Sequence, residues 1–383
     1  MEVQRIVIRR GNAEYSTWQI LRADHLPLVP VNKFLSYLEN TEKSPNTVKS
    51  YAHHLRQFFI FLERRNIDWR EIDFGVLAEF TGYLKIPAED AVKLFSAAAA
   101  PNVISFPRKT PSAMSAKSSR SNNTINVMLA AVCSFYEYHS RICELPKLNI
   151  YQLRQPMGNV RYKPFLHGMT LDKQTVVNKL NLRPERKRPK TISREEFGEL
   201  VAACDHLRDK FILSLLYETG MRVGQMLGLR HEDVRTFDKI IAITPRERNV
   251  NAARAKTNEP YSIHVSEELM RLYTDYLLDE CGEIESDYVF LNLWGEPVGR
   301  PMSYPAVVDL FRRLTRKTGI YISPHMLRHT HATEMIRLTG RPDVVSRRLG
   351  HKSIQTTLKT YAHLDETDLM RAYKEYEIKR GQK

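Results

Sequence analysis

The sequence has little of what marks secreted, membrane or zinc-binding proteins. Its 383 residues contain only 4 cysteines, which lie far apart and form no CxxC pair, so neither a disulfide framework nor a zinc cluster is indicated. It has no apolar run of the roughly 18 residues that a membrane helix needs, and no hydrophobic leader precedes the first charges. We therefore expect a soluble, cytoplasmic protein with no membrane segment and no structural metal.

Acidic residues are scarce relative to basic ones. The chain carries 58 Lys and Arg against 44 Asp and Glu, which gives a formal net charge of +14. Such an excess attracts polyanions and steers them over long range, so nucleic acid is the expected partner and association with the nucleoid the expected location. The length exceeds one typical hydrophobic core, and two domains are predicted.

The N-terminal part predicts a hairpin followed by helices. Residues 1–24 alternate apolar and polar groups on either side of a Gly-Asn pair, which favours a short hairpin or an ordered arm. A Ser-Pro pair then marks a helix start, and apolar residues recur at helical spacing behind it. The opposite face of this helix carries Lys49 and Arg56, which either contact DNA or form a solvated polar face.

A basic loop and a linker are predicted next. Residues 101–122 are rich in proline and serine and lack apolar periodicity, which is typical of a loop. The cations of this loop either grip phosphates or belong to a flexible insertion, and they are Arg108, Lys109, Lys117 and Arg120. A second apolar helix follows, so residues 25–145 are predicted to form a small helical domain. Periodicity fades over residues 146–190, the predicted interdomain linker, which is either a solvated tether or a basic strap along a phosphate backbone.

The C-terminal part opens with a helix that is apolar almost all round. A Ser-x-x-Glu capping box starts the preceding helix at Ser193, and Gly220 stands where a left-handed C-cap belongs. Arg222 follows at once and is therefore held near the core. An arginine in such a place needs an anionic partner, which is either a carboxylate of the fold or a bound phosphate.

Two short β-branched segments predict a hairpin beyond this helix. They span residues 239–244 and 261–265, and Lys256 lies where the chain enters the returning strand. A lysine there either reaches a ligand held by the helices or is simply solvated. Two amphipathic helices, at 266–280 and 303–317, and a short strand at 288–293 complete this region.

Residues 323–363 gather groups that suit phosphoryl transfer. His325 and Arg328 share one face near a helix N-terminus, where the helix dipole favours an anion. His351 follows a glycine between helices, and Tyr361 comes ten residues later. A zinc site at the neighbouring histidines is disfavoured, because no cysteine or carboxylate completes it and the arginines would repel a cation.

Four motifs resemble the tyrosine recombinases, a family that includes phage integrases and transposon enzymes. They are ETGMRVGQMLGLR, RAKTNEPYSIHV, PHMLRHTHAT and LGHKSIQTTLKTYAH, and they stand in the family order. The resemblance implies a mainly α fold with a small β-sheet, in which an N-terminal SAM-like core-binding domain and a mixed α/β catalytic domain at 191–383 form a C-shaped clamp on double-stranded DNA. It also implies a site-specific recombinase of the integrase or transposase type, which acts through a covalent 3′-phosphotyrosyl intermediate.

The resemblance assigns roles to six residues of this chain. Tyr361 is the nucleophile and Lys256 the acid for the leaving 5′ oxygen, whereas His325 assists proton transfer. The remaining three bind the phosphate oxygens and are Arg222, Arg328 and His351. One position departs from the family pattern, because Gln225 stands where the family usually has an acidic residue.

These roles are chemically consistent with one another. Arginine forks bind two oxygens at once and never lose their charge, so the pair substitutes for a metal ion and no cofactor is expected. Covalent attachment conserves the energy of the broken bond, so resealing needs no ATP. Two other functions stay open, a type IB topoisomerase that nicks and reseals DNA, and an inactive DNA-binding accessory protein.

The tail at 364–383 carries an apolar stripe in a charged helical setting. It docks either on its own domain or in a groove of a neighbouring protomer. The family resemblance implies the second arrangement and a homotetramer on DNA. Accessory proteins, either DNA-bending or encoded by the same element, are further expected partners.

Overall fold

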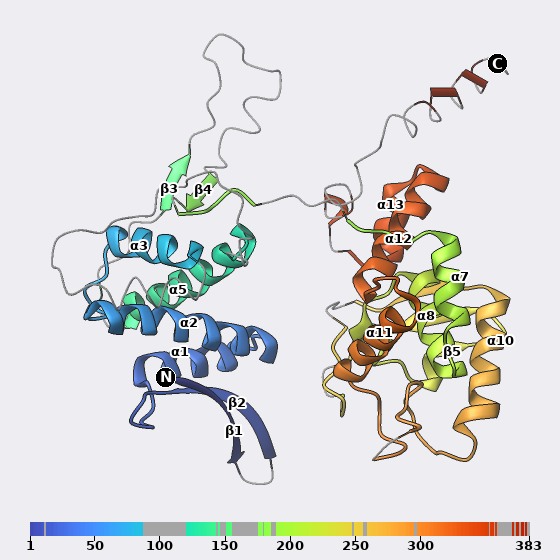
Figure 1. Ribbon diagram of the computed structural model, residues 1–383, viewed down its shortest axis with the longest axis horizontal. Coiled ribbons are helices and arrows are strands. Elements are labelled where there is room, and N and C mark those ends of the chain that lie inside the picture. The colour runs from blue at the N-terminus through green and yellow to red at the C-terminus, as the bar shows by residue number, and fades with distance from the viewer. Residues whose placement is uncertain are drawn as a thin grey trace. The chain divides into compact units, whose positions relative to one another are not determined.

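The computed structural model divides the chain into two compact units, Met1–Arg186 and Lys187–Lys383 (Figure 1). The structure describes residues 1–10, 13–86, 120–142, 145, 151–154, 175–178, 180–184, 189–246, 249–255, 259–294, 297–351, 353–355 and 357, with 370, 373, 374, 377, 378 and 380 in the tail. Within these residues no helix is both long and apolar enough to cross a bilayer. The predicted fold class, mainly α with a small β-sheet, is confirmed.

Unit 1 is built on helices that pack around an aromatic core. They are α1 (Val29–Asn40), α2 (Pro45–Arg65), α3 (Phe74–Lys85) and α5 (Asn122–Ile142). The Ser44 side chain accepts a hydrogen bond from the Thr47 amide, which confirms the predicted start of α2. Phe34 and Phe135 meet edge to face with ring centroids 5.7 Å apart, an arrangement that aromatic pairs prefer.

The predicted N-terminal hairpin is confirmed and packs on α2. Strands β1 (Glu2–Arg10) and β2 (Ala13–Leu21) pair antiparallel, with Val3 opposite Ile20 (Figure 1). Ile20 is fully buried in the core of unit 1, and its backbone exchanges two hydrogen bonds with the Asn32 amide at 2.9 and 3.2 Å. The hairpin is therefore part of the folded unit. Its turn residues lie outside the described part of the chain.

Residues 146–190, expected to be a linker, contribute structure to unit 1. Strands β3 (Tyr151–Arg154) and β4 (Thr175–Asn178) pair antiparallel within this segment. Leu180 is buried in the core of unit 1, and the Asn126 amide bonds both backbone groups of Leu182. These residues are therefore part of unit 1, whereas the sequence predicted an interdomain linker over the whole of 146–190. Two strands of four residues are too short and too far apart to produce a readable apolar period.

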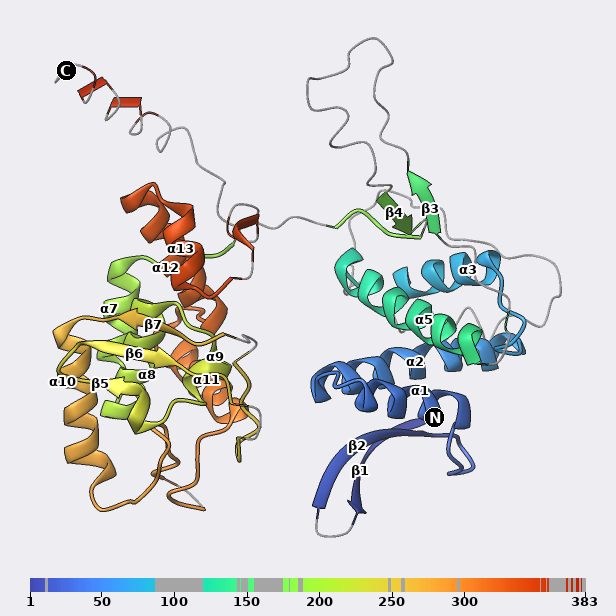
Figure 2. The same cartoon turned by 180° about the vertical axis from the view of Figure 1, so that it is seen from behind.

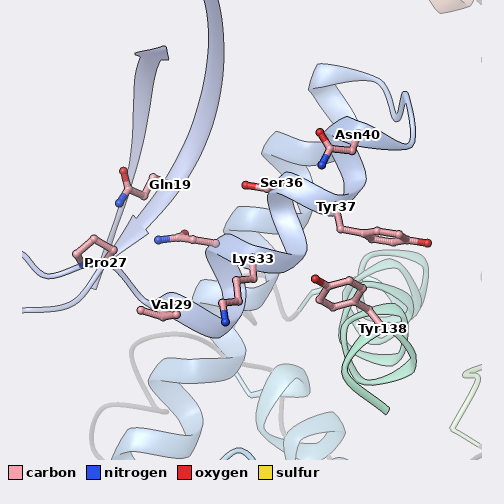
Figure 3. A pocket seen from close by; sticks show the side chains of 9 residues that line it. Gln19, Pro27, Val29, Lys33, Ser36, Tyr37, Asn40 and Tyr138 are labelled. Carbon is pink, nitrogen blue, oxygen red and sulfur yellow. The ribbon is translucent and has the colours of Figure 1, made fainter. Parts of the chain in front are cut away.

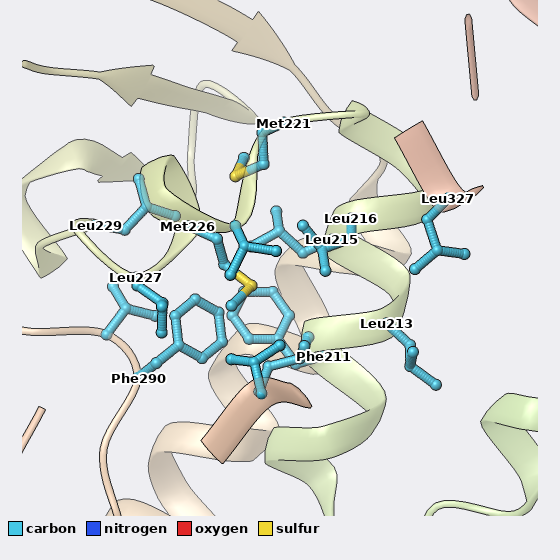
Figure 4. Close-up of a cluster of buried hydrophobic side chains, with 14 of the residues drawn as sticks. Phe211, Leu213, Leu215, Leu216, Met221, Met226, Leu227, Leu229, Phe290 and Leu327 are labelled. Atoms are coloured by element: carbon cyan, nitrogen blue, oxygen red, sulfur yellow. The ribbon is translucent and has the colours of Figure 1, made fainter. Parts of the chain in front are cut away.

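Unit 2 is built on a buried helix, α8 (Leu207–Thr219). Around it lie the helices α7 (Arg194–Ala202), α9 (Val223–Met226), α10 (Glu267–Tyr276), α11 (Tyr304–Thr318), α12 (Pro324–Thr339) and α13 (Pro342–Arg348), with a 3-10 turn η1 (His231–Asp233) and a π-helical turn η2 (Leu277–Cys281). Apolar residues from all sides of α8 enter the core, as Phe211 and Leu216 show in Figure 4. The predicted capping box is present, because Ser193 and Glu196 bond each other's backbone amides.

The small sheet of unit 2 contains the predicted hairpin. Strands β6 (Ile240–Ile243) and β7 (Tyr261–His264) pair antiparallel, and β5 (Val234–Arg235), which was not predicted, extends the sheet in the order β5-β6-β7 (Figure 2).

The prediction of a strand at 288–293 was wrong. This segment makes only single bridges, between Arg230 and Tyr288 and between Leu291 and Pro301. Its chain crosses the core and its backbone groups bond successive partners, so no continuous ladder forms.

Candidate active site

Gly220 shapes the centre of the candidate site. It has a φ of +61° and caps α8 in the left-handed conformation that the sequence predicted. A Cβ at this position would lie 2.7 Å from the His331 ring and 2.8 Å from the Leu349 side chain, so only glycine fits. The turn places Arg222 at the start of α9 and leaves the Gly220 carbonyl facing α12.

Arg328 is buried beside this turn and links three parts of unit 2. Its side chain comes from α12 and is only 5% exposed. Its Nη1 donates to the Gly220 carbonyl at 2.7 Å, and its Nη2 donates to the Leu349 carbonyl at 2.9 Å and to the His351 ring at 2.8 Å. The guanidinium therefore ties the end of α8 to the turn that follows α13.

His351 is held as a neutral ring with a defined tautomer. Its Nε2 must accept, because the Arg328 guanidinium can only donate. The proton then lies on Nδ1, which donates to the Thr357 hydroxyl at 2.8 Å. Burial and, after it, the charges of Arg328 and Arg222 together lower the pKa of His351 to about 4. Thr357 is fully buried and was missed by the sequence analysis, although its place only six residues after His351 was a usable signal.

One N–H donor of Arg222 has no acceptor in the part of the chain that the structure describes. Among the described residues, its Nη1 is buried and makes no hydrogen bond. A buried guanidinium N–H without an acceptor is costly, and a bound anion would satisfy it. The charge of Arg222 acts on both His351 and Tyr261, which places all three in one electrostatic environment with Arg328.

Gln225 and Tyr261 lie beside these charged residues and are hydrogen-bonded to each other. The Gln225 side chain is 3% exposed, accepts from the Arg222 amide at 2.8 Å and donates to the Tyr261 hydroxyl at 3.0 Å. Tyr261 begins β7, and its ring and hydroxyl lie against Gly350. The sequence analysis singled out Gln225 but missed Tyr261, which lies 36 residues away and meets it only through the hairpin.

His325 lies at the start of α12, one turn before Arg328. Its side chain is exposed, and its ring is 6.2 Å from that of His329. The pKa of His329 is lowered by burial and by the charges of His325 and Arg328. An exposed imidazole in the first turn of α12 is accessible to a ligand, whereas Arg328 is reached only from within the site.

Lys256 and Tyr361 lie outside the described residues. The structure describes the loop that precedes Lys256 as far as residue 255. This loop passes over α9. A Cβ on Gly224 would lie 3.2 Å from the carbonyl carbon of Arg254 and closer still to its oxygen. Asn251 anchors the same loop by donating to the carbonyls of Leu227 and Met302, each at 2.9 Å. The loop that leads to Lys256 is thus fixed next to the helix that Arg222 begins.

The six candidate DNA-contact residues divide equally between described and undescribed segments. Lys49 is exposed and lies over the Trp18 ring at 4.9 Å. Arg56 donates to the Met1 carbonyl at 2.7 Å, and Arg120 to that of Leu84 at 3.4 Å. The loop cations Arg108, Lys109 and Lys117 lie outside the described residues.

Two pockets have none of the proposed phosphate-binding residues in their walls. One in unit 1, of about 510 Å³, runs from Gln19 and Pro27 to the facing rings of Tyr37 and Tyr138 (Figure 3). The other, of about 480 Å³, lies in unit 2 among α7, α8, α10 and α12. Its walls combine apolar side chains with carboxylates and are formed in part by Phe197, Leu269, Leu272, Glu218, Glu268 and Glu334.

Comparison with protein families gives two matches. Residues 190–368 match the model of the phage integrase family, and residues 31–109 match that of the phage integrase N-terminal SAM-like domain. The first range contains every residue of the candidate site, and the second begins after the hairpin of β1 and β2.

Comparison with individual proteins gives relatives along the whole chain. Transposase A from transposon Tn554 of Staphylococcus aureus is 41% identical over 377 residues, which is 98% of each chain. Tyrosine recombinase XerA of Pyrococcus horikoshii is 24% identical and covers 85% of this chain and 86% of its own. Among solved structures, the Tn1549 transposon integrase in complex with circular intermediate DNA has a TM-score of 0.59 at 14% identity, covering 91% of this chain and 99% of its own.

Proposed function

The chain belongs to the phage integrase family of tyrosine recombinases, and from this membership we propose that it cleaves and rejoins DNA at the site built from Arg222, Arg328, His351 and Tyr361. The family establishes the enzyme class and site-specific recombination as the type of reaction. The observation that carries the assignment of residues is the buried Nη1 of Arg222, which has no acceptor among the described residues and lies in the environment of Arg328 and His351.

In the proposed reaction the Tyr361 oxygen attacks the scissile phosphorus in line. The bond to the 5′ oxygen of the next nucleotide breaks, and a 3′-phosphotyrosyl bond forms. Arg222 and Arg328 stabilise the charge that develops on the nonbridging oxygens. His351 is neutral here, and an anion next to it raises its pKa, so it donates to phosphate after taking up a proton.

Two further groups complete the proton balance. His325, exposed at the start of α12, takes part in removing the proton of the Tyr361 phenol. Lys256 protonates the leaving 5′ oxygen, and what supports this role is the fixed approach of its loop to α9. The reverse reaction returns both protons, so strand exchange proceeds without ATP, a metal or another cofactor.

We assign double-stranded DNA as the substrate. The net charge of +14 supports this assignment, as does the DNA in the complex of the Tn1549 integrase. Lys49, Arg56, Arg120 and the loop cations contribute phosphate contacts, and of these Lys49 is an exposed residue. The natural role is transposition, because the relative with 41% identity over 98% of both chains is a transposase.

In the proposed assembly, the tail at 364–383 couples protomers into a tetramer on DNA. Accessory DNA-bending proteins bind the same DNA. The assembly acts in the cytoplasm, at the nucleoid. Its described apolar residues, Met370, Tyr373 and Ile378, are each at least 60% exposed. The carboxylate-lined pocket of unit 2 offers apolar walls and negative charge to a segment that also carries Lys374 and Arg380. This complementarity supports docking of the tail in that pocket of a second copy.

The substitution Tyr361→Phe tests the covalent mechanism. On nicked suicide substrates built from cleavage sites mapped in the DNA next to the gene, the wild-type protein should accumulate a covalent protein–DNA adduct. Tyr361→Phe should form none while binding the same DNA with an affinity within about twofold. An adduct that persists in this variant would refute the assignment of Tyr361.

A further inference from the structure

The orientation of the Gln225 side chain is fixed by its neighbours. The Arg222 amide can only donate, so the atom of Gln225 that faces it at 2.8 Å must be the carbonyl oxygen. The amide nitrogen then faces the Tyr261 hydroxyl at 3.0 Å. An amide flip would place two donors against each other at the first contact, so this orientation follows from the chemistry of the backbone.

This orientation determines the direction of the hydroxyl of Tyr261. The amide nitrogen of Gln225 donates, so the phenol oxygen accepts. The phenol proton therefore points elsewhere, and no acceptor for it is present among the described residues. A glutamate at position 225 would have the opposite effect, because a carboxylate only accepts and would draw the phenol proton toward itself.

The hydroxyl of Tyr261 lies in the phosphate-binding part of the site. An added Cβ on Gly350, the residue before His351, would be only 2.9 Å from that oxygen. The charges of Arg328 and Arg222 both act on the phenol. Burial nevertheless raises its pKa, so the hydroxyl keeps its proton at neutral pH and is a donor.

We propose that the Tyr261 hydroxyl donates a hydrogen bond to a nonbridging oxygen of the bound phosphodiester, and that Gln225 directs it there. This inference rests on the proposed function of the site. It gives Gln225 a chemical role, because the amide makes available a donor that a carboxylate would sequester. Tyr261 then joins the two arginines and His351 as a ligand of the transferring phosphate.

A double-mutant cycle tests whether Gln225 directs the Tyr261 hydroxyl toward the phosphate. Single-turnover cleavage of the suicide substrate is measured for the wild type, Tyr261→Phe, Gln225→Glu and the double variant. With Gln225 present, Tyr261→Phe should slow cleavage about 10- to 100-fold, as expected for loss of one hydrogen bond to a charged group. In the Gln225→Glu background, the same substitution should change the rate less than about twofold. An equal effect in both backgrounds would show that Gln225 does not direct the hydroxyl, and it would overturn that part of the proposal.

A second measurement covers the case in which Gln225→Glu itself abolishes cleavage. Methylphosphonate substrates replace one nonbridging oxygen of the scissile phosphate in each of two stereoisomers. The effect of Tyr261→Phe should disappear for the isomer that lacks the contacted oxygen and remain for the other. An identical effect on both isomers, or no effect with the normal phosphodiester, would overturn the proposal.

Two controls separate the possible failures. Tyr273→Phe removes a buried hydroxyl that bonds the His231 ring and none of the candidate site residues, so it should leave cleavage unchanged. Failure of the wild-type protein to form any adduct would refute the proposed function itself. Normal adduct formation with an additive cycle would refute only the role of Gln225, and normal adduct formation with no effect of Tyr261→Phe would refute only the role of Tyr261.

Discussion

Gly224 offers a way to displace Lys256 without touching it. In Gly224→Ala the new Cβ would lie 3.2 Å from the carbonyl carbon of Arg254 and closer to its oxygen, whereas carbon atoms prefer separations of about 3.5 to 4.0 Å. One side must move by roughly 1 Å to restore ordinary contact. Arg254 is exposed, but α9 is buried through Val223 and Met226, so we expect the loop to move.

The consequence should be a specific loss of leaving-group protonation. A displacement of about 1 Å at a catalytic group costs on the order of 100-fold in rate, and we expect this loss for cleavage of the normal phosphodiester. A 5′-thio leaving group departs without an acid, so this substrate should restore cleavage by Gly224→Ala, and it should equally restore cleavage by Lys256→Ala. Adduct formation on paired suicide substrates measures both.

The control is Gly198→Ala in α7, where the added methyl meets nothing within 4 Å. This variant should cleave normally and be more stable by about 0.5 to 1 kcal/mol, because alanine favours the helix. Two results would refute the reasoning. One is normal cleavage by Gly224→Ala, and the other is a loss that the thio substrate fails to restore, which would indicate that α9 and Arg222 have moved instead.

The remaining predictions concern acid stability and assembly. Burial and the charge of Arg348 lower the pKa of His331 from 6.5 to about 4, so the folded state binds its proton less readily than the unfolded state. The free energy of unfolding should therefore fall by up to roughly 3 kcal/mol as pH drops from about 6.5 to 4. His331→Gln should remove this part of the loss, as measured by urea unfolding. Equal acid sensitivity of the wild type and the variant would contradict the prediction. Deleting residues 364–383 should leave binding of a single protomer to DNA intact and should abolish the larger protein–DNA complexes seen in sedimentation. Glu268→Lys, in the carboxylate-lined pocket of unit 2, should weaken these larger complexes. Unchanged complexes in both variants would show that neither the tail nor this pocket joins protomers.

Local sequence patterns predicted the frame of the site. Gly220 was expected as a left-handed cap, and its φ of +61° confirms this because the signal depends only on neighbouring residues. The capping box at Ser193 and the start of α2 at Ser44 were predicted on the same basis and are present. The hairpin strands β6 and β7 followed from their β-branched content.

Contacts between distant segments could not be predicted in this way. Tyr261 meets Gln225 only because the hairpin returns it to α9, and no spacing in the sequence encodes that register. The partner of Lys49 was missed for a similar reason, since the hairpin that brings Trp18 over α2 folds back from the N-terminus. The roles of Lys256 and Tyr361 stay predictions from the motifs that contain them.

The contact between Gly350 and Tyr261 also constrains how this protein can change over generations. A side chain at position 350 would overlap the phenol ring, so a mutation there is tolerable only after position 261 has become smaller. Loss of the phenol would in turn remove the partner that an amide at position 225 serves. Positions 225, 261 and 350 should therefore be inherited as a set, in which a change at 350 can only follow a change at 261.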